Sequence, residues 1–306
     1  MIDAENLTKK FGELTAVDDL TLHVKEGEVF GFLGPNGAGK TTAVRIFVGL
    51  ISKTSGEAMI GGYDIGSSAD RQKIRQIIGI LPENVGLYEE LSGYQNLDFY
   101  GRLYKLSKKQ RQERIEHFLK MLGLWEKRDV TAGTFSKGMK QKLAIARALI
   151  HDPKILFLDE PTANLDPEAS KIVRDFILEL KKEDRTIFLN THLLSEAGKI
   201  CDRLGIIKTK LLAVDTPQRL IQSLGSKKTV IQLEQVNNTI VRAVEKLESG
   251  KVEVTRNKLF IEVKDPEKEN PDILKAIINA GGRVQLVSDV SPTLEDAYLK
   301  FVRSVE

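Results

Sequence analysis

The sequence has one cysteine, little net charge and no long apolar run. Cys201 has no second cysteine to pair with, so an intrachain disulfide is excluded and a reducing compartment fits. The 46 lysine and arginine residues nearly balance the 43 aspartate and glutamate residues, and the net charge of +3 does not indicate nucleic-acid binding. No stretch approaches the roughly 18 consecutive apolar residues of a membrane span, and the polar N-terminus is not a signal peptide. Any membrane spans would have to come from another chain.

The length and the change in pattern along the chain predict two domains. The 306 residues suffice for a large domain and a small one. We expect the first over residues 1–222 and the second over 226–306, because the character of the sequence changes around Gly225–Ser226. The second part alternates as β-α-β-β-α-β with a final helix, which predicts a small α+β, ferredoxin-like module. It contains no catalytic constellation, so dimerisation, regulation or partner docking is expected of it.

Residues 34–42, GPNGAGKTT, fit the phosphate-loop pattern G-x-x-x-x-G-K-[ST]. Residues 28–33 before them predict a buried strand, and the apolar spacing after them predicts a helix. Glycines in the loop let successive backbone N–H groups curl around phosphate at a helix N-terminus. Lys40 can reach the β- and γ-phosphates, and the Thr41 hydroxyl is placed to bind Mg²⁺. An ordinary glycine-rich turn is the simpler alternative, but the flanking pattern favours a phosphate site.

Polar residues follow two later buried strands. Asp159 and Glu160 come directly after the apolar run 155–158, and Asn190-Thr191-His192 follows the run 186–189. Open parallel sheets bind ligands at the carboxyl ends of their strands. Adjacent acids in such a place need a metal or another partner for their charge. Solvent-exposed acids and a structural histidine are the alternatives, and the phosphate loop upstream favours a catalytic site.

The remaining sequence predicts antiparallel strands and helices. Residues 2–33 suggest short antiparallel strands, and residues 55–80 suggest further strands punctuated by glycines. Residues 91–123 follow a helical pattern, with Ser107 and Gln110 as a capping box. Asp166 is the expected N-cap of another helix.

The motifs GPNGAGKTT, FSKGMKQKLAIARAL, ILFLDEP, ANLDP and NTH, in this order, resemble the ATP-binding subunit of an ABC transporter. The resemblance covers residues 1 to about 222. The later stretches DRLGII and LEDAYLKFV look like the multidrug-like subfamily that serves ABC-2-type exporters. The implied fold is an α/β P-loop NTPase (ABC ATPase) domain with antiparallel β and helical subdomains, followed by the ferredoxin-like domain.

The resemblance implies ATP and Mg²⁺ as ligands and a role for each matching residue. Phe11 would stack on adenine and Val17 would pack near the ribose. Glu160 would polarise the attacking water, while Lys40 and His192 would contact the γ-phosphate. Thr41, Asp159 and Glu83 would hold Mg²⁺. The phosphates would be cradled by Gly34, Pro35, Asn36, Gly37, Ala38, Gly39, Lys40, Thr41 and Thr42.

The resemblance also implies a shared active site. The signature residues Ser136, Lys137, Gly138 and Met139 would contact ATP on the opposite protomer, and Asp166 would cross the same interface. One chain would therefore need a second copy or a paralogous ATPase subunit. A separate transmembrane permease would dock on the loop from Glu83 to about Tyr100 and hold the chain at the cytoplasmic face of the membrane.

Three departures from the family pattern occur. Glu83 stands where glutamine is usual, and a carboxylate accepts hydrogen bonds without donating them. The signature is SKGMK instead of SGGQ, with Ser136 and Gly138 kept, and Ala163-Asn164 stand where serine or glycine is common.

Two other functions compete with the transporter subunit. One is a soluble ABC-type mechanical ATPase acting on DNA or ribosomes, which the near-neutral charge disfavours. The other is a nucleotide-binding regulator without turnover, which the presence of Lys40, Glu160 and His192 disfavours. A co-encoded chain with about six apolar 20-residue segments would favour the exporter.

Overall fold

The computed structural model describes residues 1–163, 165–224, 227–247, 250–290 and 292–304. The chain divides into two compact units, Met1–Pro217 with Phe301–Glu306, and Gln218–Lys300. The expected change of domain at Gly225–Ser226 falls on residues outside the described ranges. None of the helices within those ranges is long and apolar enough to cross a bilayer.

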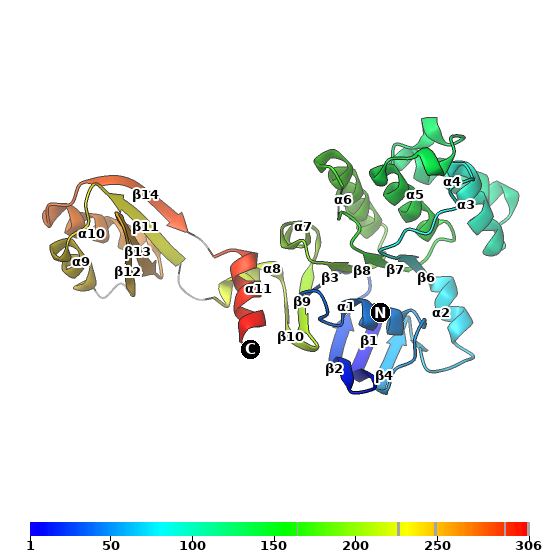
Figure 1. Cartoon of the computed structure of the whole chain (residues 1–306), viewed down its shortest axis with the longest axis horizontal. Helices are drawn as coiled ribbons and strands as arrows, with labels where there is room; N and C mark the ends of the chain where they lie inside the picture. The colour runs from blue at the N-terminus through cyan, green and yellow to red at the C-terminus, as the bar shows by residue number, and fades with distance from the viewer. Residues whose placement is uncertain (164, 225–226, 248–249, 291, 305–306) are drawn as a thin grey trace. The chain divides into compact units, whose positions relative to one another are not determined.

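A six-stranded sheet forms the centre of the larger unit (Figure 1). Its strands are β3 (Val29–Leu33), β6 (Ile78–Leu81), β7 (Ile155–Asp159), β8 (Thr186–Thr191), β9 (Arg203–Lys208) and β10 (Lys210–Asp215). The order is β10-β9-β3-β8-β7-β6, and only β9 and β10 pair antiparallel. Every residue of β3, β7 and β8 is buried, as expected for parallel strands covered on both faces. The three apolar strands predicted from the sequence are confirmed.

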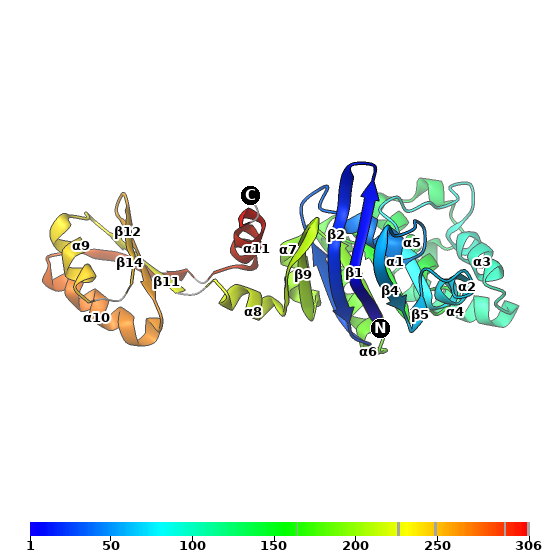
Figure 2. The ribbon, with the colours of Figure 1, turned by 90° about the horizontal axis from the view of Figure 1, so that it is seen from below.

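A second, antiparallel sheet of the same unit has the order β2-β1-β4-β5 (Figure 2). Its strands are β1 (Ile2–Phe11), β2 (Leu14–Val24), β4 (Ser55–Ile60) and β5 (Tyr63–Asp64). The antiparallel strands predicted before the phosphate loop are therefore confirmed. Between residues 55 and 80 the structure also has a helix, α2 (Arg71–Ile77), where only strands were expected. Ile74 is its one buried residue, so its apolar residues do not mark a helical face in the sequence.

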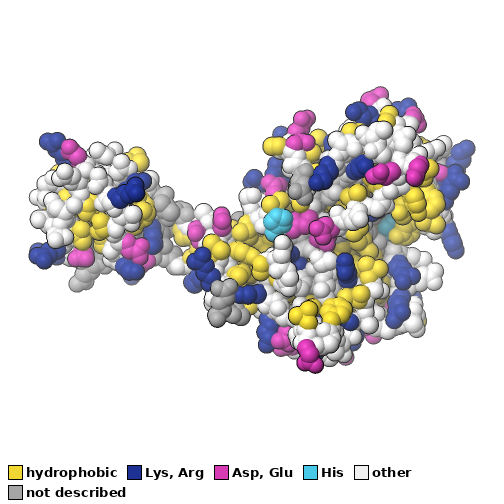
Figure 3. Space-filling model, in the orientation of Figure 1, with side chains coloured by type: hydrophobic (Ala, Val, Ile, Leu, Met, Phe, Trp, Pro, Cys, Tyr) yellow, Lys and Arg dark blue, Asp and Glu magenta, His cyan; other side chains and the backbone are white. Residues whose placement is uncertain are grey.

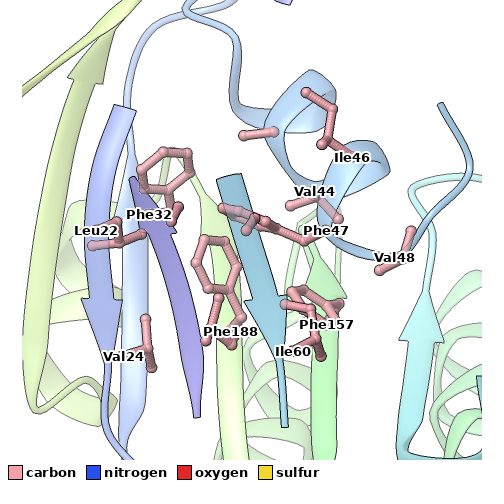
Figure 4. Close-up of a cluster of buried hydrophobic side chains, with 14 of the residues drawn as sticks. Leu22, Val24, Phe32, Val44, Ile46, Phe47, Val48, Ile60, Phe157 and Phe188 are labelled. Atoms are coloured by element: carbon pink, nitrogen blue, oxygen red, sulfur yellow. The ribbon is translucent and has the colours of Figure 1, made fainter. Parts of the chain in front are cut away.

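Aromatic side chains fill the core between the two sheets and α1 (Lys40–Phe47) (Figure 4). The ring centroid of Phe188 lies 5.3 Å from that of Phe32, 5.8 Å from Phe47 and 5.6 Å from Phe157. These residues come from β8, β3, α1 and β7, so one cluster fixes the last turn of α1 against three central strands. The loop before α1 is positioned by this packing.

Three helices pack against one another beside the sheets: α3 (Gly93–Leu103), α4 (Lys108–Met121) and α5 (Lys137–Leu149). The single helical stretch expected over 91–123 is thus two helices. The break follows Leu103, where Lys105 has a left-handed backbone with φ of 59°. Ser107 forms the predicted capping box with Gln110. Two short 3₁₀ turns, η1 (Trp125–Lys127) and η2 (Ala132–Thr134), lead into α5.

The rest of the larger unit includes α6 (Pro167–Lys182) and α7 (Leu194–Ile200), and α8 (Pro217–Gln222) begins where this unit ends. Asp166 caps α6 as predicted, because its Oδ1 accepts a hydrogen bond of 2.8 Å from the backbone N–H of Ala169.

The smaller unit has the predicted β-α-β-β-α-β order. Its elements are β11 (Lys227–Leu233), α9 (Asn238–Glu245), β12 (Val252–Thr255), β13 (Lys258–Val263), α10 (Pro266–Asn279) and β14 (Val284–Val290), followed by α11 (Leu294–Arg303). The antiparallel sheet has the order β12-β13-β11-β14, which is the ferredoxin-like arrangement. Apolar residues of α9 and α10, such as Ile240 and Ile277, pack on one face of this sheet.

Candidate functional site

The phosphate loop is held in a conformation that only glycine permits at two positions. A Cβ on Gly34 would lie 2.3 Å from the backbone oxygen of Ile207, and a Cβ on Gly39 would lie 2.1 Å from that of Ala16. Gly39 also has a φ of 95°, in the left-handed region. The loop is therefore pressed against β9 and β2, and its backbone leads directly into the N-terminus of α1. This is the geometry of an anion-binding helix terminus.

The Lys40 side chain is folded back over this loop. Its Nζ donates hydrogen bonds to the backbone oxygens of Gly34, at 2.7 Å, and Pro35, at 3.1 Å. Burial lowers the pKa of Lys40, while the charges of Glu160 and Asp159 act in the opposite direction. The ammonium group is thus held at the loop, where its positive charge would attract phosphate.

A cavity of about 550 Å³ lies over the loop. The residues that line it are Phe11, Leu14, Thr15, Ala16, Asn36, Gly37, Ala38, Gly39, Lys40, Thr41, Thr42, Glu83 and Thr209. Phe11 lines the cavity and is about half exposed, with the Lys9 ammonium 4.7 Å from its ring centroid. Val17 is fully buried in the core beneath the loop, 3.3 Å from the position of a Cβ on Gly39, so it supports the loop from below.

Asp159 is buried at the end of β7, beside Asn190 of β8. The side-chain amide of Asn190 donates a 2.6 Å hydrogen bond to Oδ1 of Asp159. Burial raises the pKa of Asp159 to about 6, with further upward contributions from Glu160 and Glu83, while the hydrogen bond from Asn190 and the charge of Lys40 oppose it. Burial disfavours the charged form of this carboxylate, and a nearby cation would stabilise that form.

Glu160 lies in a different environment, although it is the next residue. Its carboxylate accepts hydrogen bonds from the Thr191 hydroxyl, at 3.0 Å, and from the His192 backbone N–H, at 3.0 Å. The ring Nδ1 of His192 lies 2.6 Å from Oε1 of Glu160. Glu160 also has a φ of 49°, an unusual conformation for a residue with a side chain. The C-terminal end of β8 therefore fixes the direction of this carboxylate.

The oxygen atoms around the cavity are suitable for a hard divalent cation. Thr41 and Glu83 line the cavity, and Asp159 is close enough to feel the charges of Glu83 and Lys40, which also line it. Oδ1 of Asn190, next to Asp159, is buried without a hydrogen-bond donor among the described residues, and a cation-bound water would supply one. Those residues include no cluster of three or more His, Cys, Asp or Glu side chains that could hold a metal ion. Mg²⁺ is usually held by one or two protein oxygens together with water and substrate phosphates, and the Thr41 hydroxyl and the Glu83 carboxylate are oxygens of this kind at the cavity.

A second cavity, of about 390 Å³, is lined by residues of α5 and by Glu160 and His192. Its lining includes Lys137, Glu160, His192 and Glu83. Met139 is partly buried, and Gly138 is buried, with its Cβ position 3.2 Å from the Cβ of Ala169.

Ser136 is exposed and caps α5, accepting a 3.2 Å hydrogen bond from the backbone N–H of Met139. Asp166, the cap of α6, is exposed as well. Both residues can therefore be reached by another molecule.

Asn190 and Thr191 were not predicted as site residues. Asn190 is opposite Asp159 in the parallel pairing of β7 with β8, and Thr191 is the next residue of β8. Both are polar and buried in the structure. Their place after an apolar run is visible in the sequence, but their pairing with Asp159 and Glu160 is not.

Comparisons with known proteins agree on one family. A family profile described as "ABC transporter" matches residues 17–163. The chain is similar to the linearmycin resistance ATP-binding protein of Bacillus subtilis (strain 168), with 36% identity over 81% of this chain and 79% of that protein. It is 35% identical to the bacitracin transport ATP-binding protein of Bacillus licheniformis, over 99% of this chain and 97% of that protein. It is 34% identical to a Nod factor export ATP-binding protein of Cupriavidus metallidurans, over 98% and 96%.

Solved structures give the same picture for the larger unit. The ATP-binding cassette MJ0796, in a dimeric post-hydrolysis state bound to ADP and Pi, matches with a TM-score of 0.65 and 28% identity. The match covers 71% of this chain and 98% of that one. An ATP-binding subunit of an ABC transporter matches with a TM-score of 0.67 and 29% identity, over 74% of this chain and 93% of that one.

Proposed function

Because this chain belongs to the ABC transporter family as an ATP-binding, ATP-hydrolysing subunit, we propose that it powers export through a separate membrane permease. The observation that carries the proposal is the phosphate loop together with Glu160, which follows β7, and His192, which follows β8. Glu160 and His192 line a cavity together with residues of the signature helix α5. Relatives matched over nearly the whole chain are named for bacitracin transport and Nod factor export, which favours an exporter.

The phosphate loop and Phe11 would bind ATP. The adenine would stack on the exposed Phe11 ring, with Val17 supporting the loop near the ribose, and the phosphates would lie on the backbone N–H groups of residues 34–42 at the N-terminus of α1. The Lys40 ammonium would transfer its hydrogen bonds from the loop carbonyls of Gly34 and Pro35 to phosphate oxygens. The cavity of about 550 Å³ over these residues supports this assignment.

Glu160 and His192 would act on the attacking water and the γ-phosphate. Thr191 and His192 fix the Glu160 carboxylate, so it can accept a hydrogen bond from a water placed in the second cavity. The Thr41 hydroxyl, Asp159 and Glu83 would hold Mg²⁺. Bound Mg²⁺ would neutralise charge on the β- and γ-phosphates.

A complete site would require two nucleotide-binding domains. Ser136, Lys137, Gly138 and Met139 would contact ATP on the opposite protomer, and Asp166 would lie at the same interface. The exposure of Ser136 and Asp166 supports this, as does the dimeric state of MJ0796. The second domain would be another copy of this chain or a paralogous ATPase subunit.

Residues 1–222 would form the ATP-binding domain and residues 226–306 an accessory domain. The boundary between Pro217 and Gln218 supports this division within a few residues, and only Phe301–Glu306 of the accessory domain group with the larger unit.

The permease would dock where apolar side chains surround a groove of about 430 Å³. Leu50, Tyr100 and Tyr104 line this groove together with Pro82. Leu50 is 67% exposed. The exposed rings of Tyr88 and Phe99 lie near the groove residue Tyr100, with ring centroids 6.2 and 5.5 Å from that of Tyr100. Exposed apolar clusters of this kind mark protein interaction sites. Docking would hold the chain at the cytoplasmic face of the membrane.

A soluble ATPase acting on nucleic acid is the weaker candidate. On the face of the larger unit shown in Figure 3, acidic and basic side chains are interspersed. Binding to nucleic acid would favour a continuous basic surface.

The proposal is tested by comparing two apolar-to-acidic variants in native cells. Leu50→Asp alters the groove, and Leu286→Asp, at a 56% exposed position of the smaller unit, is the matched control. We expect wild type and Leu286→Asp to co-purify in detergent with one polytopic membrane chain, and Leu50→Asp to lose it while keeping its ATPase activity. Equal recovery of that chain with both variants would rule out this groove, and recovery of ribosomes or DNA-bound complexes instead would favour the soluble alternative.

A further inference from the structure

Arg147 connects the signature helix to the loop that carries Glu83. It lies in the last turn of α5, and its side chain is 9% exposed. Its Nη1 donates hydrogen bonds to the backbone oxygens of Val85, at 2.5 Å, and Gly86, at 2.7 Å. Hydrogen bonds from a charged donor are about twice as strong as neutral ones. The loop is therefore attached to α5 two residues after Glu83.

The segment that precedes Glu83 in the chain also contacts α5. The strand β6 ends at Leu81, and a Cβ on Gly79 of this strand would lie 2.3 Å from the backbone oxygen of Ala148. The ring Nε2 of His151, just after α5, lies 2.8 Å from the backbone oxygen of Ile78. The C-terminal end of α5 therefore packs tightly against β6. Along the chain, Glu83 lies between Leu81, the last residue of β6, and Val85, which Arg147 contacts.

Arg147 also faces the groove beside α3. Its guanidinium carbon lies 5.2 Å from the ring centroid of Tyr100, and both side chains line the groove of about 430 Å³. A displacement of α3 against α5 would change this contact. One buried side chain thus contacts both the groove and the loop of the nucleotide site.

We propose that Arg147 is a positioning residue that holds the Glu83 loop against α5, so that the Glu83 carboxylate faces the metal and phosphate space. The proposal rests on the metal role proposed for Glu83. If α5 and the loop move together, Glu83 reaches the bound nucleotide only when α5 is correctly placed. Without the Arg147 guanidinium, the position of the Glu83 loop would no longer follow the position of α5.

The test compares Arg147→Met with Arg114→Met. Methionine keeps an apolar stem and removes the donors. Arg114 is the matched control because its Nη1 also donates to a backbone oxygen, that of Ile150 at 3.0 Å, away from the loop. The readout is the affinity for a fluorescent ATP analogue, measured with Mg²⁺ and with EDTA. We expect Arg147→Met to bind as wild type in EDTA and about tenfold more weakly with Mg²⁺, and Arg114→Met to match wild type in both.

A double-mutant cycle with Glu83→Ala separates this inference from the proposed function. Non-additive losses for Arg147→Met and Glu83→Ala in Mg²⁺-dependent affinity support the inference. If Glu83→Ala weakens that affinity and Arg147→Met does not, the inference is overturned and the site assignment stands. If Glu83→Ala has no effect, the metal role of Glu83 fails and the inference fails with it. If Arg147→Met does not fold, Arg147→Gln, which removes the charge and shortens the side chain, takes its place.

Discussion

Two adjacent carboxylates at the end of β7 have different surroundings, and these suit different tasks. Asp159 is buried, and its pKa is raised to about 6, mainly by burial, so its charge is best stabilised by a cation. Glu160 is fixed by hydrogen bonds from Thr191 and His192 and faces the second cavity. The first arrangement suits a metal ligand and the second suits a group that orients water. One step along the backbone, with a φ of 49° at Glu160, separates the two environments.

At the residue scale we predict an acid-sensitive contribution from His151. Its ring is stacked on Tyr104 with centroids 3.7 Å apart, and its pKa is lowered to about 4, mainly by burial. The unfolded chain, with a histidine pKa near 6.5, binds this proton more readily than the folded chain between pH 6.5 and 4. The folded state therefore loses stability as the pH falls through this window, by up to about 3 kcal/mol.

The measurement is urea unfolding at several pH values, followed by the fluorescence of Trp125, the single tryptophan, which lies in the larger unit. His151→Gln should flatten the pH dependence between pH 6.5 and 4 relative to wild type. The control is His117→Gln, at an exposed position of α4, which should leave the slope unchanged. The same slope in all three proteins would contradict the account of His151.

At the element scale, two serine N-caps allow structure and catalysis to be separated. Ser136 caps α5 at 3.2 Å from the Met139 backbone N, and Ser107 caps α4 at 3.3 Å from the Gln110 backbone N. Ser136→Ala and Ser107→Ala should each lower the free energy of unfolding of the larger unit by about 1 kcal/mol. Only Ser136→Ala should also slow ATP hydrolysis, by roughly a hundredfold, because it removes a hydroxyl proposed to bind phosphate across the interface.

Hydrolysis rates and urea midpoints of the two variants, measured side by side, check this prediction. A similar loss of hydrolysis in both would mean that the effect comes from helix stability. Unchanged hydrolysis in Ser136→Ala would remove Ser136 from the proposed site.

The elements also show what the sequence could and could not predict. The phosphate loop, the buried strands and the caps at Ser107 and Asp166 depend on neighbouring residues, and local patterns identified them. The helix at Arg71–Ile77 was missed because it buries one side chain only. Asn190 depends on the register of β7 with β8, and the contact of Arg147 with Val85 joins segments 62 residues apart. Single-sequence patterns carry no information on such pairings.

For the whole molecule, the central claim is a nucleotide site completed by a second ATP-binding domain. The larger unit supplies the phosphate loop, the acids and the signature helix, and the family to which the chain belongs includes dimeric cassettes. Glu160→Gln should keep the phosphate loop intact while slowing hydrolysis, since an amide polarises water less than a carboxylate. ATP would then remain bound and hold two chains together.

The most direct measurement is the mass of Glu160→Gln by light scattering on a sizing column, with and without Mg-ATP. The account predicts a monomer that becomes a dimer only when Mg-ATP is present. The control, Glu160→Gln combined with Lys40→Ala, should stay monomeric, because the loss of the Lys40 ammonium weakens ATP binding. A Glu160→Gln chain that binds Mg-ATP and remains monomeric would contradict a site formed by two copies of this chain, and a paralogous ATPase subunit would then have to supply the second domain.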